Sequence, residues 1–173
     1  QNLEPLTRNV YFTRGSTALL DAVGGAIDEC KAAIAKKPNV LDEVLAGTAL
    51  EPEEVTVTFA IFTDGEENAS QKHKKEEIAD AIKELTDSGW TFLYLGADQD
   101  KWQAERAASV LNIAAGNTRG YAKSAANFNQ TFDMMSAGTS KRLRDSKVGI
   151  ANTQQFFQEA EEELQTQESG DKN

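Results

Sequence analysis

The clearest strand in the sequence covers residues 55–62 (VTVTFAIF), which become apolar on both faces toward their C-terminal end. A strand of this kind is typical of the interior of a parallel sheet that helices cover on each side. The strand ends at the polar turn Thr63-Asp64-Gly65, and a second apolar strand, residues 90–97, follows an intervening helical stretch. This order predicts a βαβ unit and a mainly parallel sheet.

Helical periodicity surrounds these strands, because apolar residues recur three and four positions apart. The predicted helices cover residues 19–34, 78–85, 102–111, 128–135 and 157–164. Ser16 or Thr17 is expected to cap the first helix and Pro38 to end it. Residues 37–54 are expected to form a connection and residues 114–124 a loop or a short edge strand. The predicted fold class is α/β, with helices on both faces of the sheet.

The charge distribution narrows the classes of partner. A formal net charge of −10 repels phosphate backbones, so we expect no nucleic-acid binding. A small basic cluster is expected to be the polar face or end of a helix; it consists of Lys141, Arg142, Arg144 and Lys147. No run approaches the roughly 20 apolar residues that a membrane helix needs, so no membrane partner is expected. The single cysteine, Cys30, is expected to be a buried thiol in a reducing, cytoplasmic compartment.

The length of 173 residues predicts one domain. Apolar residues with helical spacing end at Leu164, and acidic residues dominate the rest of the chain. We therefore expect the domain to cover residues 1–164 and an acidic, solvated tail to cover residues 165–173.

Candidate functional residues lie where the strands end, because ligands of open α/β sheets bind beyond the carboxyl ends of the strands. Asp64 follows the first strand, and Thr17 at the head of the first helix can supply a hydroxyl to the same edge. A carboxylate and a hydroxyl without histidine or cysteine are hard oxygen ligands, which suit Mg²⁺ and do not suit zinc.

Two segments resemble the von Willebrand factor type A (VWA) domain, particularly its intracellular bacterial and phage members. They are residues 15–22 (GSTALLDA) and residues 59–68 (FAIFTDGEEN). Residues 96–100 (GADQD) are also similar, and the resemblance covers about residues 3–113. It implies a three-layer, Rossmann-like fold and a metal-ion-dependent adhesion site (MIDAS), in which Thr17 and Asp64 are the matching metal ligands.

The first MIDAS motif, Asp-x-Ser-x-Ser, occurs nowhere in the chain. The strand that carries this motif and two neighbouring strands also have no counterpart, which leaves the strand at residues 55–62 with an unpaired edge. The resemblance therefore implies a VWA fold that is incomplete at its N-terminus. Either an upstream segment of a longer protein supplies the missing strands, or the protein is a natural variant with an incomplete site. Mg²⁺ binding is expected only if an upstream segment supplies the missing motif.

The resemblance implies a protein-binding module and no enzyme activity, with an acidic side chain of the partner completing the Mg²⁺ shell. The expected partner-binding rim consists of Ser16, Gly65, Glu66 and Asp98 beside the metal ligands. One alternative is a structural subunit of a phage or multiprotein assembly with a degenerate site. Another is a Mg²⁺-dependent hydrolase that uses Asp64 and Asp98 as its carboxylates.

Other polar residues have simpler expected roles. Asp98 and Asp100 are expected to cap the helix that follows them. Glu66 and Glu67 are expected to be solvated loop acids. Ser16, Asp64 and His73 occur in the chain order of a hydrolase triad, but no Gly-x-Ser-x-Gly motif surrounds the serine, so this arrangement is not expected to be catalytic.

Overall fold

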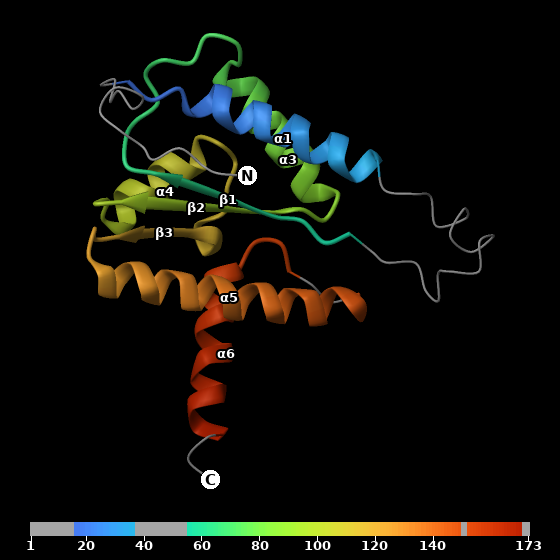
Figure 1. The fold of residues 1–173 in the computed structure, drawn as a ribbon, viewed down its shortest axis with the longest axis vertical. Coiled ribbons are helices and arrows are strands. Elements are labelled where there is room, and N and C mark those ends of the chain that lie inside the picture. Colours follow the sequence, from blue (N-terminus) through green and yellow to red (C-terminus); the bar gives the residue numbers. More distant parts are fainter. Residues whose placement is uncertain (1–15, 37–54, 150–151, 171–173) are drawn as a thin grey trace, which may run out of the picture.

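The computed structural model describes residues 16–36, 55–149 and 152–170, and within them three strands form one parallel sheet. The strands, in spatial order, are β1 (Thr58–Thr63), β2 (Thr91–Ala97) and β3 (Thr118–Tyr121). Thr63 is level with Gly96, and Gly96 is level with Gly120, so all three strands end at one edge of the sheet (Figure 1). The predicted α/β class with a parallel sheet is confirmed.

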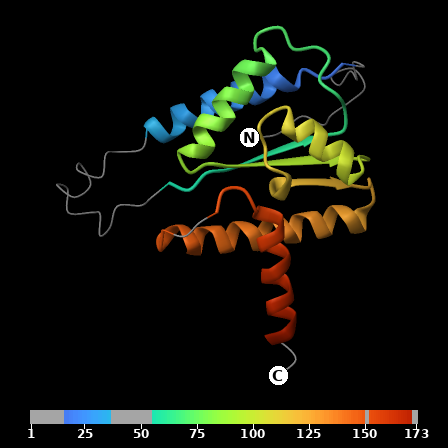
Figure 2. The same cartoon turned by 180° about the vertical axis from the view of Figure 1, so that it is seen from behind.

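Helices cover both faces of this sheet, as Figures 1 and 2 show from opposite sides. One face carries α1 (Leu19–Ala35), α3 (Lys75–Asp87) and α4 (Lys101–Ser109). The other carries α5 (Ala125–Lys147) and α6 (Phe156–Gly170). The central strand β2 is buried throughout, with Phe92 and Tyr94 in the first core and Leu93 and Leu95 in the second. Of the helices in the described residues, none has the length and apolar character to cross a bilayer.

The first predicted helix is confirmed as α1, but two details of the prediction are wrong. Its N-cap is Ala18, and neither Ser16 nor Thr17 caps it with a side chain. Cys30 is partly exposed, because the buried stripe of α1 ends at Ile27. Pro38 and the predicted connection at residues 37–54 lie outside the described residues.

The C-terminal half of the chain follows the prediction in outline. β3 is the short edge strand allowed for residues 114–124, preceded by a 3₁₀ turn at Ala115–Asn117. The last two predicted helices are α5 and α6. However, α6 continues through Gly170, so residues 165–170 of the predicted tail are helical, with Gln165 and Thr166 exposed.

At the other edge of the sheet, β1 has β2 as its only strand neighbour within the described part of the chain. Its burial is correspondingly lower than that of β2, and Phe62 is 41% exposed. Any strand that pairs with this edge, as the sequence predicts for an upstream segment, would lie outside the described residues.

Two adjacent glycines of α1 provide a test of how the helix packs. A Cβ on Gly24 would lie 2.6 Å from the His73 ring, whereas a Cβ on Gly25 would meet no atom within 4 Å. We expect Gly25→Ala to raise the free energy of unfolding by about 0.5–1 kcal/mol through helix propensity. Gly24→Ala should lower it by about 1 kcal/mol, because the His73 ring must move. Urea denaturation would measure both, and an equal effect of the two substitutions would contradict this packing.

Candidate functional site

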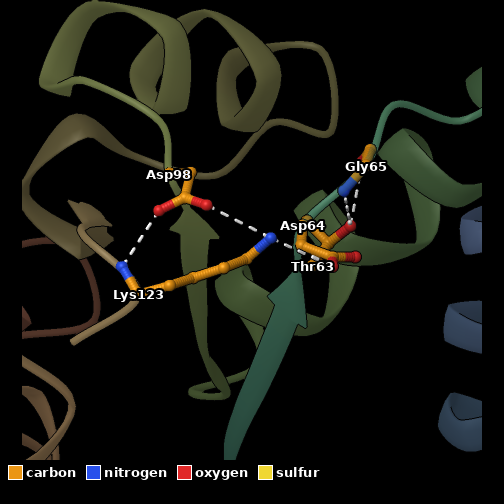
Figure 3. Close-up of polar contacts among 5 residues, drawn as sticks. All are labelled: Thr63, Asp64, Gly65, Asp98 and Lys123. Atoms are coloured by element: carbon orange, nitrogen blue, oxygen red, sulfur yellow. Dashed lines mark hydrogen bonds and ion pairs between the residues drawn. The ribbon is translucent and has the colours of Figure 1, made fainter. Parts of the chain in front are cut away.

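The carboxyl ends of the three strands bring two carboxylates and one ammonium group together. Asp64 directly follows β1, Asp98 directly follows β2, and Lys123 lies two residues after β3. The Nζ atom of Lys123 lies 3.3 Å from an oxygen of Asp64 and 3.3 Å from an oxygen of Asp98 (Figure 3). We call these three residues the rim triad. Asp64 and Asp98 were predicted to lie at this edge, but nothing in the sequence indicated Lys123.

The contacts within the rim triad favour the charged forms of Asp98 and Lys123. The backbone N–H of Lys123 donates to Asp98 Oδ1 at 2.9 Å, and this bond, followed by the Lys123 ammonium, lowers the pKa of Asp98. Hydrogen bonds to Asp98 and then to Asp64 raise the pKa of Lys123. The side chains are 70% (Asp64), 55% (Asp98) and 50% (Lys123) exposed, so solvent and other ions reach the triad. The triad is therefore a solvent-accessible, exchangeable ion-pair site.

Asp98 adopts a left-handed backbone conformation with a φ of 55°, which is uncommon for a residue other than glycine. Its N–H donates to Tyr121 O at 2.7 Å, so the turn is fixed from the end of β3. The conformation aims the Asp98 carboxylate at Lys123 and does not aim it at α4 (Figure 3). The sequence suggested that both Asp98 and Asp100 cap the following helix. This is wrong for Asp98, whereas Asp100 caps α4 by accepting from Gln103 N–H at 2.8 Å.

Thr17 lies at the same edge of the sheet. A Cβ on Gly65 would be 2.8 Å from Thr17 Oγ1, so the threonine hydroxyl is packed directly against the residue that follows Asp64. The turn itself is closed by Thr63, whose hydroxyl donates to Gly65 O at 2.9 Å and accepts from Gly65 N–H at 3.3 Å (Figure 3). The structure thus brings together the segments of Thr17 and Asp64, although the Asp64 carboxylate pairs with Lys123.

The loop after β1 holds the N-terminus of α1. The Glu67 carboxylate accepts hydrogen bonds from the N–H groups of Leu20, Ala69 and Ser70 and from the Ser70 hydroxyl, at 2.7–3.0 Å. In return, Asp21 of α1 accepts from the N–H groups of residues 71–73, each at 2.9 Å. We call this reciprocal set the α1 clasp.

The α1 clasp changes the acidity of both carboxyl groups. Partial burial alone would raise the pKa of Glu67, but its four hydrogen bonds outweigh this effect and lower the pKa to about 2. The hydrogen bond from Gln71 is the main cause of a lowered pKa at Asp21. The sequence prediction that Glu67 is a solvated loop acid is therefore wrong: it is a structural anion that positions the first turn of α1. Thr17 is held by Asn68, which accepts from the Thr17 N–H at 2.8 Å and donates its own N–H to Thr17 O at 3.1 Å. Glu66 is exposed, as expected.

A cavity of about 530 Å³ opens beside the rim triad. Asp64 and Lys123 line one part of it, and Phe62 and Phe128 line another. Phe132 extends the aromatic surface, because its ring centroid is 5.6 Å from that of Phe62 and 4.6 Å from that of Phe128. Phe128 and Phe132 are correctly predicted to lie on a helix, but they are 47% and 44% exposed and are not part of the core.

The oxygen chemistry of this edge suits Mg²⁺, but the arrangement of the described residues does not. No group of three His, Cys, Asp or Glu side chains in the described ranges could hold a metal ion. Asp64 and Asp98 are both engaged by the Lys123 ammonium, which lies where a shared cation would have to bind. The described residues therefore place two carboxylates here that are both paired with Lys123, with no third carboxylate, histidine or cysteine grouped beside them.

The remaining candidates have structural roles. The ring of His73 packs against Gly24, and its backbone N–H belongs to the α1 clasp. Arg142 is buried and donates to Gly89 O and Asn152 O, so the predicted basic face of α5 lacks one of its four members.

Comparison with protein-family models, curated proteins and solved structures gives no match to this chain.

Proposed function

We propose that this chain is a protein-binding module with a VWA-like organisation that recognises its partner at the C-terminal edge of the sheet. The observation that carries the proposal is the convergence of the rim triad, Thr17 and an open cavity at that edge. Within the described residues the two exposed carboxylates are paired with the Lys123 ammonium, which favours binding over hydrolysis, because a hydrolase needs an acid or base that is free to act on its substrate.

A photo-crosslinking amino acid at position 66, on the exposed side of this edge, tests the proposal. Position 88 is the matched control, because it follows the C-terminal end of α3 and precedes the start of β2, away from the edge where the strands end. We expect one identifiable protein to be crosslinked from position 66 and not from position 88, and its yield to fall when Asp64 is replaced by alanine. Equal products from both positions would contradict a binding edge and would favour a structural subunit.

The role of Mg²⁺ in this binding is conditional on a segment that supplies Asp-x-Ser-x-Ser. For the present chain we expect calorimetric titration with MgCl₂ to give no saturable heat in the millimolar range, because Mg²⁺ loses its hydration shell reluctantly and needs several fixed oxygen ligands. A saturable heat that disappears in Asp64→Ala would instead show that Mg²⁺ displaces Lys123 and would support the metal-dependent mode.

A further inference from the structure

Three exposed phenylalanine side chains form a continuous surface that we call the aromatic face. Phe62 comes from β1, and Phe128 and Phe132 come from successive turns of α5. The rings of Phe62 and Phe132 are stacked with an interplanar angle of 13°, and all three residues are more than 40% exposed. Contiguous exposed apolar surface of this kind marks an interaction site more often than single exposed residues do.

The aromatic face is continuous with the rim triad through the cavity that Phe62, Phe128, Asp64 and Lys123 line. A segment lying on the rings therefore lies next to Asp64 and Lys123, which line the same cavity. Aromatic rings and carboxylates together are the surroundings that a cationic side chain favours, because ring faces attract cations and carboxylates accept their hydrogen bonds.

The charge at this edge selects the sign of the partner. Two carboxylates share one ammonium group, so the rim triad has a net negative charge, and the exposed Glu66 adds to it. The whole chain carries −10. An incoming carboxylate would be repelled, whereas an incoming cation could take the place of the Lys123 ammonium without leaving either aspartate unpaired.

Lys123 is well placed for such an exchange. Its side chain is half exposed and reaches Asp64 and Asp98 only through its terminal nitrogen, at 3.3 Å from each. Exposed ion pairs contribute little net stability, so their exchange is easy. Lys123 thus acts as an intramolecular substitute for a ligand cation.

We infer that the aromatic face docks a basic segment of a partner protein, with one arginine or lysine side chain replacing the Lys123 ammonium between Asp64 and Asp98. Apolar side chains of the same segment cover Phe62, Phe128 and Phe132. This inference rests on the proposed function and specifies the chemistry of the partner.

The probe for this inference is a blocked peptide of alternating arginine and valine, compared with a peptide in which glutamate replaces each arginine. Binding is measured by calorimetry and by NMR shifts of the phenylalanine rings. Lys123→Met should tighten binding of the arginine peptide about tenfold, because both carboxylates become available. Asp64→Asn should weaken it about fivefold. The glutamate peptide should not bind.

The matched control is Lys83→Met, which removes the same charge from an exposed lysine that pairs with Asp87 on α3. It should leave affinity for the arginine peptide within about twofold of that of the unmodified chain, since only overall charge changes. Equal gains from Lys83→Met and Lys123→Met would overturn the inference, because the peptide would then respond only to net charge.

Other occupants of the aromatic face give distinct results, each of which would also overturn the inference. A second copy of this chain would appear as a concentration-dependent dimer in sedimentation, abolished by Phe132→Ser, with no peptide response. If the partner is acidic, the glutamate peptide should bind to the unmodified chain, and Lys123→Met should abolish this binding. If the peptides fail but position 66 still crosslinks one protein, the proposed function survives and only the basic chemistry of the partner is wrong.

Discussion

Replacing Glu67 with alanine should lower the free energy of unfolding by about 2 kcal/mol, because its four hydrogen-bond donors lose their shared acceptor. One of those donors, Leu20 N–H, belongs to the first turn of α1 and has no partner within the helix. The same substitution should loosen the head of α1 and raise amide hydrogen exchange there. Chemical denaturation and hydrogen exchange of residues 19–22 would measure the two effects.

The neighbouring Glu66→Ala is the control, since Glu66 is exposed and should change stability by less than about 0.5 kcal/mol. Glu67→Gln keeps one acceptor oxygen and should have an intermediate effect. Similar losses from Glu66→Ala and Glu67→Ala would show that the α1 clasp contributes no specific stability.

The α1 clasp also predicts an acid dependence. The folded-state pKa of Glu67, about 2, lies below its ordinary value of 4.5. The stabilisation by its charge is therefore complete above about pH 4.5 and is lost as the pH falls through about 2. The stability difference between the unmodified chain and Glu67→Gln should narrow over this interval. A difference that stays constant from pH 5 to about 2 would contradict the lowered pKa.

Gly120→Ala should lower the free energy of unfolding by about 3 kcal/mol, because backbone atoms block the new methyl group. This loss is near the upper end of the range that is typical when a methyl group is added at a packed position. A Cβ at this position would lie 3.0 Å from Asp100 O and closer still to Gln99 O. Neither atom can rotate away as a side chain can. The substitution should also displace β3 from β2, at the register of Gly96 and Gly120.

Because Lys123 follows β3, the same change should separate its ammonium from Asp64 and Asp98. Thermal denaturation would measure the loss of stability, and the NMR shifts of the Lys123 side chain would measure the loss of the rim triad. Gly25→Ala, which adds the same methyl group in open space, is the matched control. An unfolding midpoint equal to that of the unmodified chain would show that β3 tolerates the methyl group.

The order of the elements could be predicted because each depends on local periodicity. The strand at residues 58–63, for example, is apolar on both faces, which is a property of its own sequence and of its place in a covered sheet. The weakest local signal belonged to β3, an edge strand of four residues whose pairing depends on a close approach at Gly120.

The candidate site was only partly predictable, because its contacts join distant positions. Asp64 and Asp98 were identified by their place after strands, a rule that uses local sequence. In the sequence, Lys123 cannot be distinguished from any other exposed lysine, because its place beside Asp64 and Asp98 depends on the pairing of β3 with β2. Phe128 and Phe132 show the helical spacing of core residues, but they lie beside β1, where the described sheet ends and no further strand covers them. Glu67 is separated from Leu20 by 47 positions, so no local pattern links them.

The long separation of the α1 clasp has a consequence for the order of assembly during folding. The bonds that join α1 to the loop in this clasp connect residues 47–52 positions apart, whereas β1, α3 and β2 are consecutive in the sequence. Closing a longer loop loses more chain entropy before contacts compensate for it, so α1 should dock after the βαβ unit has formed. On partial opening, α1 would then detach first and carry the Thr17 hydroxyl away, while Asp64, Asp98 and Lys123 stay together.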